Sequence, residues 1–154
     1  MTCCFFGHKD TPSSVYEKLE EAVEKVIVED GVSSFLVGNQ GQFDSMALSA
    51  LRELKIKYPR INYNVVLAYM PAEKEMWNPY EYGETMLPEG IEEVHPKYAI
   101  SWRNDWMLRQ SNYVIAYIHH NWGGAARYVQ KACRQGKTVI NLCQNTYFRG
   151  GKTE

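Results

Sequence analysis

The sequence predicts an α/β fold: a single Rossmann-like domain of three layers, built around a mostly parallel, five-stranded sheet. Short apolar runs rich in β-branched and aromatic residues alternate with segments of helical periodicity, which is typical of βαβ units. The 154 residues, of which 45% are hydrophobic and 23% charged, suit one globular domain with an ordinary core. With right-handed crossovers, the simplest strand order is 3-2-1-4-5.

The first strand and the first helix are predicted at the N-terminus. Thr2 to Phe6 form a short apolar run that suits a buried strand. A helix follows, and Ser14 and Glu17 near its start have the spacing of a capping box. Gly31 is expected to end this helix, because glycine readily takes the left-handed conformation found at helix C-termini.

The next two strands are predicted on either side of a second helix. Ser33 to Val37 form the second strand, and Asn62 to Tyr69, rich in valine and aromatic residues, form the third. The helix between them is expected to be capped by Asp44 or Ser45. It should end before Pro59, because the residue before a proline disfavours helical conformation.

Residues 70–100 break the alternating pattern. They contain four prolines and two glycines, and they predict a long loop or lid with at most one irregular helix. Helical signal returns from Trp102 to Gln110. A loop of this length in a compact domain is usually functional or mobile.

The stretch after the lid completes the predicted fold. Tyr113 to Ile118 form the fourth strand, a helix begins after Gly123-Gly124, and Thr138 to Leu142 form the fifth strand. We therefore expect a binding domain over residues 1–143 and a polar tail over residues 144–154.

Glycine-containing loops follow the first, second and fourth strands. In a parallel sheet these strand ends share one edge, and ligands bind there where the direction of winding reverses, here between the first and fourth strands. Glycine lets a ligand approach the backbone, and a helix N-terminus offers N–H groups to an anion. The candidate phosphate-binding residues are Gly7, His8, Gly38, Gly41, Gly123 and Gly124. The alternative is that these glycines only make tight turns and close packing.

Several larger side chains have two interpretations each. Asp44 can cap its helix or hold a ribose hydroxyl, and Arg103 can bind a phosphate or lie in solvent. Trp77, Trp102 and Trp106 can stack on a base, or they can seal the core or a subunit contact.

The composition argues against several kinds of partner. The net charge of −1 provides no basic field for nucleic acid. No apolar run approaches the ~20 residues that span a bilayer, so no membrane association is expected. The N-terminus lacks the basic segment of a signal peptide, and we expect a cytoplasmic protein.

The spacing of cysteine and histidine residues predicts neither a metal site nor another cofactor. Adjacent Cys3 and Cys4 point to opposite faces of a strand, and no CxxC pair exists. His8 could be combined with the two cysteines, or His119 with His120, but adjacent residues in a strand diverge and zinc ligands usually converge. We therefore expect free thiols and loop histidines.

Three segments resemble the SLOG superfamily: residues 2–9, the loop at residues 38–44, and residues 111–130. This superfamily includes the LOG phosphoribohydrolases and the fold of DNA-processing protein A. The resemblance is closest to a small bacterial group that begins with a T-G-H-R-like first strand. It implies a Rossmann-like domain that binds a small-molecule nucleotide derivative, and a homodimer would fit the family.

The resemblance also implies what the site lacks. Hydrolases of the superfamily carry P-G-G-x-G-T-x-x-E after an upstream R-x-x-x-M. Residues 103–107 are similar to the upstream element, and Gly123-Gly124 align with the glycine pair. Gln130, a further candidate binding residue, replaces the glutamate, and a neutral amide has no useful basicity near pH 7.

The function that this pattern implies is a nucleotide-binding sensor or regulator. One alternative is a nucleoside-monophosphate phosphoribohydrolase, in which Asp44 or Asp105 supplies the missing carboxylate. The other alternative is a DNA-handling module, which the near-neutral charge disfavours.

Overall fold

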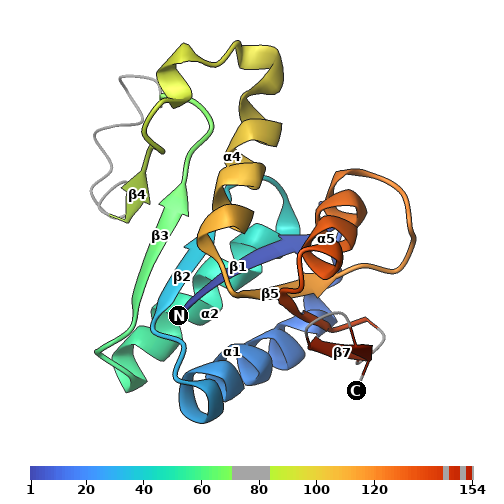
Figure 1. Cartoon of the computed structure of the whole chain (residues 1–154). Helices are drawn as coiled ribbons and strands as arrows, with labels where there is room; N and C mark the ends of the chain where they lie inside the picture. The colour runs from blue at the N-terminus through green and yellow to red at the C-terminus, as the bar shows by residue number, and fades with distance from the viewer. Residues whose placement is uncertain (71–83, 144–145, 150–151, 154) are drawn as a thin grey trace.

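A single twisted sheet runs through the molecule and carries helices on both faces (Figure 1). The structure is a computed structural model, and it describes residues 1–70, 84–143, 146–149 and 152–153. The predicted α/β class is confirmed: the sheet and its two helical layers form a three-layer, Rossmann-like arrangement.

The five predicted strands are all present. They are β1 (Thr2–Gly7), β2 (Ser34–Val37), β3 (Asn62–Val66), β5 (Tyr113–Tyr117) and β6 (Thr138–Asn141). They keep their predicted relative order, β3-β2-β1-β5-β6, and all neighbours among them are parallel.

The predicted count of five strands is wrong, because the sheet is extended at both edges. The additional strands are β4 (Thr85–Met86), β7 (Thr146–Arg149) and β8 (Lys152–Thr153). β4 pairs in parallel with β3, whereas β7 and β8 continue the sheet beyond β6 in antiparallel fashion. The full order is β4-β3-β2-β1-β5-β6-β7-β8, so the sheet reaches into both the predicted lid and the predicted tail.

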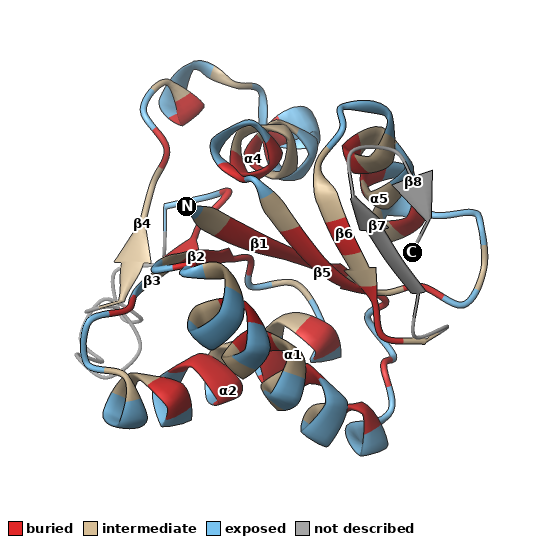
Figure 2. Cartoon of the chain, turned by 60° about the horizontal axis from the view of Figure 1, so that its bottom comes forward, coloured by how far each residue is buried: buried red, intermediate tan, exposed pale blue. Residues whose placement is uncertain are grey.

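The helices bury the two faces of the sheet separately. α1 (Tyr16–Asp30) and α2 (Gln42–Lys57) cover one face, and α4 (Pro96–Gln110) and α5 (Gly124–Arg134) cover the other (Figure 1). Alternate residues of β1 serve the two cores: Cys3 and Phe5 pack with α1 and α2, whereas Cys4 and Phe6 pack towards α4 and α5. Figure 2 shows β1 and β5 buried between these layers.

The predicted helix caps are partly wrong. α1 does not begin with a capping box, because Ser13–Val15 form a 3-10 turn first and no side chain caps the helix that follows. α2 begins at Gln42, before both predicted caps, and Gly41 at its N-terminus has φ 95°. The predicted end of α1 is confirmed, since Gly31 takes the left-handed conformation with φ 70°.

Part of the predicted lid forms regular structure in the described residues. Residues 71–83, including Trp77, lie outside the described residues. Beyond them, β4 and a 3-10 turn at Ile91–Glu93 lead into α4, which starts at Pro96 and not at Trp102. Pro96 occupies the first turn, where proline is well tolerated, and the His95 side chain accepts a hydrogen bond from the Lys97 N–H.

None of the helices in the described ranges combines the length and the apolar character that crossing a bilayer requires.

Candidate functional site

The order of the sheet reverses between β1 and β5. The chain builds β2 and β3 on one side of β1, and it builds β5 and β6 on the other side. Gly7 at the end of β1 pairs with Tyr117 at the end of β5, so the loops that follow the two strands leave the sheet side by side. The His119 N–H donates to His8 Nε2 at 3.2 Å and joins these loops. This is the switch point at which ligands bind in open α/β sheets.

A cleft of about 440 Å³ lies at this point, between the strand ends and the helices α4 and α5. Six of the nine candidate binding residues line it: Gly7, His8, Asp44, Arg103, Gly123 and Gly124. The cleft thus brings together residues from the loops after β1 and β5, from the first turn of α2 and from the middle of α4.

Three of the candidate glycines serve packing. A Cβ on Gly7 would lie 2.2 Å from Cγ of Phe43, and a Cβ on Gly41 would lie 2.7 Å from Cα of Lys9. Gly38 does not line the cleft; a Cβ there would lie 2.8 Å from Asp44 Oδ2 and 3.3 Å from the guanidinium carbon of Arg103. These glycines hold the walls of the cleft together, which matches the packing interpretation.

The glycine pair before α5 is different. A Cβ on Gly124 would meet no atom within 4 Å, and one on Gly123 would meet only a ring carbon of His120 at 3.9 Å. Packing therefore does not require a glycine at position 124. Gly123 has φ 93°, a conformation that L side chains rarely adopt, and it turns the chain into the helix.

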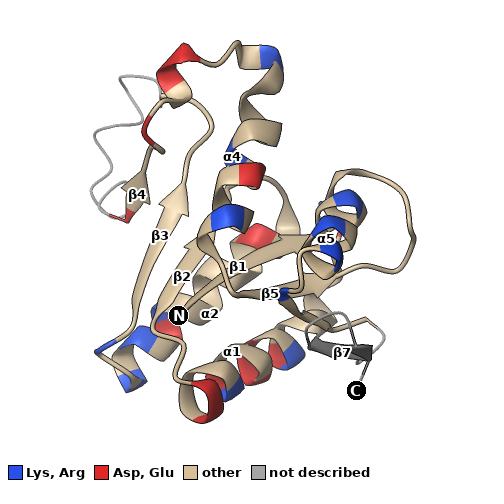
Figure 3. Ribbon diagram, in the orientation of Figure 1, with Lys and Arg blue, Asp and Glu red and all other residues tan. Residues whose placement is uncertain are grey.

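The N-terminus of α5 faces the cleft without a cap. No side chain caps it, its first turn has no acidic residue, and the helical ladder starts with the bond from the Arg127 N–H to the Gly123 carbonyl. The N–H groups of Gly124, Ala125 and Ala126 therefore have no partner within the helix. Figure 3 shows that the charged side chains of α5 are basic, which does not compensate the positive end of the helix dipole.

Arg103 is buried in the wall of the cleft, with 1% of its surface exposed. Its Nη1 donates to the Val66 carbonyl at 2.8 Å and to Asn39 Oδ1 at 3.2 Å, and its Nε donates to Asn104 Oδ1 at 2.8 Å. Burial lowers the pKa of Arg103, although nearby Asp44 opposes this effect. The predicted alternative of a solvated arginine is therefore wrong.

Asp44 lies across Gly38 from Arg103. Its Oδ2 accepts a hydrogen bond from the Gln40 N–H at 2.9 Å, so it holds the loop after β2 and does not cap α2. Although the residue is only partly buried by surface area, protein atoms surround its carboxyl group, and burial raises the pKa of Asp44 to about 6. No ion pair within 4.0 Å joins Asp44 to Arg103 among the described residues.

Gln130 lies outside the cleft. It lines a neighbouring cavity of about 690 Å³ beside the loop after β5, and its Nε2 donates to the Asn121 carbonyl at 3.2 Å. Asp105, which the sequence suggests together with Asp44 as a replacement for the missing glutamate, does not line the cleft either. Its carboxylate pairs with Lys131 at 2.6 Å. Of the carboxylates considered in the sequence, only Asp44 reaches the site.

The described tryptophans take different places. Trp102 packs on the small core around Ile91, and Trp106 packs on the core beneath α4 and α5, as the structural alternative predicts. Trp122 was not selected from the sequence, yet it lines the cleft, is 69% exposed and stacks on His120 with ring centroids 3.7 Å apart. Its position directly before the glycine pair is the feature of the sequence that could have identified it as a lining residue.

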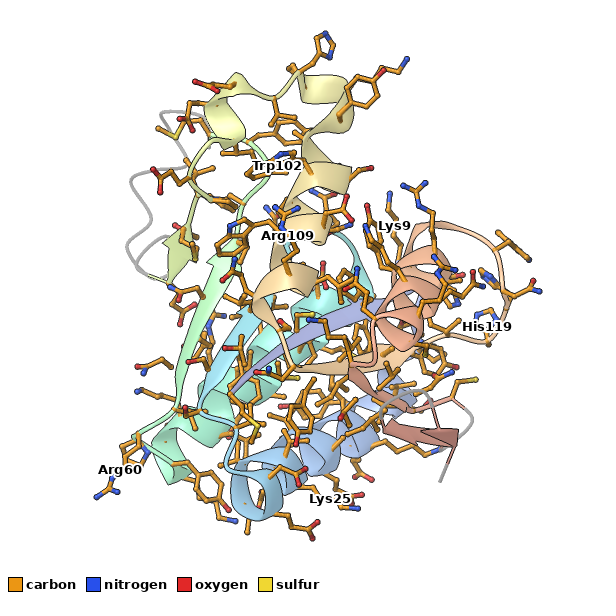
Figure 4. The ribbon with its side chains drawn as sticks, viewed as in Figure 1. Lys9, Lys25, Arg60, Trp102, Arg109 and His119 are labelled. Carbon is orange, nitrogen blue, oxygen red and sulfur yellow. The ribbon has the colours of Figure 1, made fainter. Side chains whose placement is uncertain are left out.

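Lys9 is a second lining residue that sequence reasoning did not select. It follows His8 in the loop after β1, and its side chain lies on the side of the sheet where α4 and α5 pack (Figure 4). Its carbonyl accepts a hydrogen bond from the Gln42 N–H at 2.8 Å, which ties this loop to the start of α2. Lys9 and Arg103 are the two cationic residues that line the cleft.

Three histidines gather beside the cleft. His8 from the loop after β1 meets His119 and His120 from the loop after β5, and one ring nitrogen from each lies within 4.8 Å of the others. Burial lowers the pKa of His8, and the two neighbouring histidines lower it further. Imidazole nitrogens grouped in this way can hold a transition metal.

Comparisons with known proteins assign no family to this chain. No protein-family model matches the sequence, and no curated protein matches it.

Proposed function

We propose that the protein binds a nucleotide or nucleotide-derived ligand in the cleft between β1, β5, α4 and α5, and that it acts as a sensor or regulator of the SLOG type. One observation carries the proposal: the uncapped N-terminus of α5 opens into the cleft at Gly124, where nothing within 4 Å would obstruct even a side chain. A phosphate there would accept hydrogen bonds from free N–H groups at the positive end of the helix dipole.

The charges around the cleft support a phosphate. Arg103 is a buried cation whose three hydrogen bonds go to neutral acceptors, and Lys9 adds a second positive charge. Guanidinium and ammonium groups are the usual protein partners of phosphate oxygens. The cleft therefore offers an anion two cations in addition to the helix N-terminus, although the carboxylates of Asp10 and Asp44 line it as well.

Other lining residues suit the rest of a nucleotide. The Asp44 carboxylate has one oxygen bonded to the Gln40 N–H, and a carboxylate has further lone pairs for hydroxyl groups of a ribose. Trp122 presents an exposed aromatic surface at the same cleft, and such surfaces stack on bases. A phosphorylated nucleoside thus matches the lining better than a free phosphate does.

The test is calorimetric titration with nucleoside mono- and diphosphates, ADP-ribose and dinucleotides, with the unphosphorylated nucleosides as comparison. A Gly124→Asp variant places a carboxylate at the helix N-terminus and should weaken binding at least roughly tenfold, since tenfold corresponds to about 1.4 kcal/mol. The control is Gln42→Asp, which puts the same group on the first residue of α2, outside the cleft lining.

Binding by the control but not by Gly124→Asp supports the site. Equal affinities in the wild type and Gly124→Asp, or heat of binding from the nucleosides alone, would contradict a phosphate-binding cradle at α5.

A second candidate is cleavage of the N-glycosidic bond of a nucleoside monophosphate. Asp44 favours it, because a carboxyl group in the cleft with a pKa of about 6 has the acid–base character that such a reaction needs near neutral pH. Chromatographic detection of released base tests this candidate. Activity that disappears in Asp44→Asn and persists in Asp105→Asn supports it, and absence of released base from all monophosphates rejects it.

A further inference from the structure

The three clustered histidines come from distant parts of the sequence and from two different loops. Ring centroids lie 4.4 Å apart for His8 and His119, 3.9 Å apart for His8 and His120, and 4.6 Å apart for His119 and His120. His8 is buried, His120 is half-buried and His119 is exposed, so the cluster is fixed at one end and accessible at the other.

From this geometry we propose that His8, His119 and His120 bind one divalent transition-metal ion of the Zn²⁺ class. The proposal goes beyond nucleotide binding and does not depend on it. The three residues supply three imidazole nitrogens, and the His₃ set is a known zinc-ligand set that leaves a fourth position open.

His120 already has the tautomer of a metal ligand. Its Nδ1 lies 2.8 Å from the Trp122 carbonyl oxygen, which can only accept, so Nδ1 carries the ring proton. Nε2 of the neutral ring therefore keeps a free lone pair. A second ring nitrogen that donates to a backbone carbonyl is the usual outer contact of a metal-bound histidine, and stacking on Trp122 further fixes this ring.

His8 exchanges one partner for another when the ion binds. Its Nε2 accepts the His119 N–H at 3.2 Å, at the long end of the hydrogen-bond range, so the neutral ring carries its proton on Nδ1. Nε2 is thus the coordinating atom, and the ion takes the place of the amide. A neutral hydrogen bond contributes only about 1 kcal/mol, which coordination can exceed.

The distances fit a site that closes on its ion. Ligand nitrogens at 2.0–2.1 Å from a tetrahedral zinc lie roughly 3.3 Å from one another. The histidine nitrogens lie within 4.8 Å, so each pair has to close by about 1.5 Å or less. His119 is exposed and free to make this movement. Because the His8 and His120 rings are stacked at an interplanar angle of 25°, one of these rings also has to turn before both lone pairs point at one ion.

The donor set selects the kind of ion. Three imidazoles without a carboxylate suit Zn²⁺, Co²⁺, Ni²⁺ or Cu²⁺, whereas Mg²⁺ and Ca²⁺ prefer oxygen ligands. His8 and His120 also line the cleft, so the open coordination position would lie next to the proposed phosphate site.

The experiment uses the full chain without a polyhistidine tag, freed of metal by chelation and dialysis. Titration with Co²⁺ should give the visible absorption of a tetrahedral complex at one ion per chain, and Zn²⁺ should displace it. Mg²⁺ should not compete. In a ¹H–¹⁵N spectrum the His119 amide signal should move on Zn²⁺ addition, because its hydrogen bond to His8 is broken.

The chain offers a matched set of variants. His119→Ala alters an exposed residue and should leave the fold intact while it weakens Zn²⁺ binding by at least roughly 10- to 100-fold, the loss seen on removal of outer-shell partners alone. His120→Gln should do the same. His95→Gln changes the fourth histidine of the chain, which lies at the start of α4 and is not part of the cluster. This variant should bind Zn²⁺ like the wild type.

Stoichiometric binding that depends on His119 and His120 but not on His95 supports the site. No Co²⁺ absorption with no heat of Zn²⁺ binding, or binding that the His119→Ala and His120→Gln variants retain in full, overturns it and leaves the cluster as an aromatic stack that packs two loops.

Discussion

Replacing Asp44 by asparagine should change how the stability of the protein depends on pH. Burial raises the pKa of the Asp44 carboxyl group from 3.8 to about 6 in the folded protein. The folded state therefore holds this proton more tightly than the unfolded state does. The stability that protonation provides is fully present below about pH 4 and is lost as the pH rises through about 6.

The size of the effect follows from the shift. The difference between 3.8 and about 6 corresponds to about 3 kcal/mol of unfolding free energy. Asparagine has nearly the same shape and does not titrate. The stability of Asp44→Asn relative to the wild type should therefore rise by up to about 3 kcal/mol, most of it between about pH 4 and about pH 7, whatever the constant cost of the substitution itself.

Urea unfolding at a series of pH values measures this difference. Asp105→Asn is the control, because it also removes one negative charge but lies outside the cleft, in the pair with Lys131. A difference between Asp44→Asn and the wild type that stays constant from about pH 4 to about pH 7 would refute the reasoning. It would mean that water or a movement of the loop relieves the burial of the carboxylate.

Four further substitutions distinguish packing from binding. Gly7→Ala should lower the unfolding free energy by about 1–3 kcal/mol, because its Cβ would lie 2.2 Å from Cγ of Phe43. The Cβ of Gly124→Ala would meet no atom within 4 Å, so this variant should keep nearly the same thermal stability but bind phosphate ligands more weakly in calorimetry. Arg103→Met should lower the unfolding free energy by about 1–3 kcal/mol, because it leaves the buried Val66 carbonyl at the end of β3 without its hydrogen-bond donor. An unchanged unfolding free energy in urea would contradict this. Gln130→Glu should release no more base than the wild type and should leave ligand affinity unchanged, since Gln130 lies outside the cleft. Base release that appears or increases in the variant would contradict this.

The sequence predicted the central strands well because their signal is local. Each of the five is a short apolar run between helical segments, and topology rules then leave few orders for them. The added strands escaped prediction for a physical reason. β4 has only two residues, and its place depends on main-chain pairing with β3, which no pattern of side chains records.

The start of α4 shows a second limit. His95 caps this helix through its ring, although serine, threonine, aspartate and asparagine are the residues normally expected there. The apolar positions that follow include Ala99, which packs on a small separate core with Ile91 and Ala68. The periodic signal of the main core begins only later, so the prediction began at Trp102.

The sequence predicts which loops meet better than it predicts the role of each residue in them. Topology brought the loops after β1 and β5 together, as the structure has them. The role of each glycine could not be predicted, because it depends on which side chain lies opposite. Phe43 fills the space at Gly7, whereas nothing fills it at Gly124. The spacing of the sequence does not predict the histidine cluster, because His8 is distant in the sequence from His119 and His120; the pairing of β1 with β5 brings their loops together.

Arg103 connects these observations. A guanidinium that is 1% exposed would normally be expected beside a carboxylate at ion-pair distance, yet its hydrogen bonds go to a carbonyl and two amides. Gly38 lets Asp44 and Arg103 approach the same backbone atoms, but the two are not joined at ion-pair distance. Neutral groups thus accept the hydrogen bonds of Arg103, while Asp44 acts on its charge only through space. Lys9 and Arg103 share the cleft lining with the carboxylates of Asp10 and Asp44, so the free N-terminus of α5 is the feature that most favours the anionic ligand proposed above.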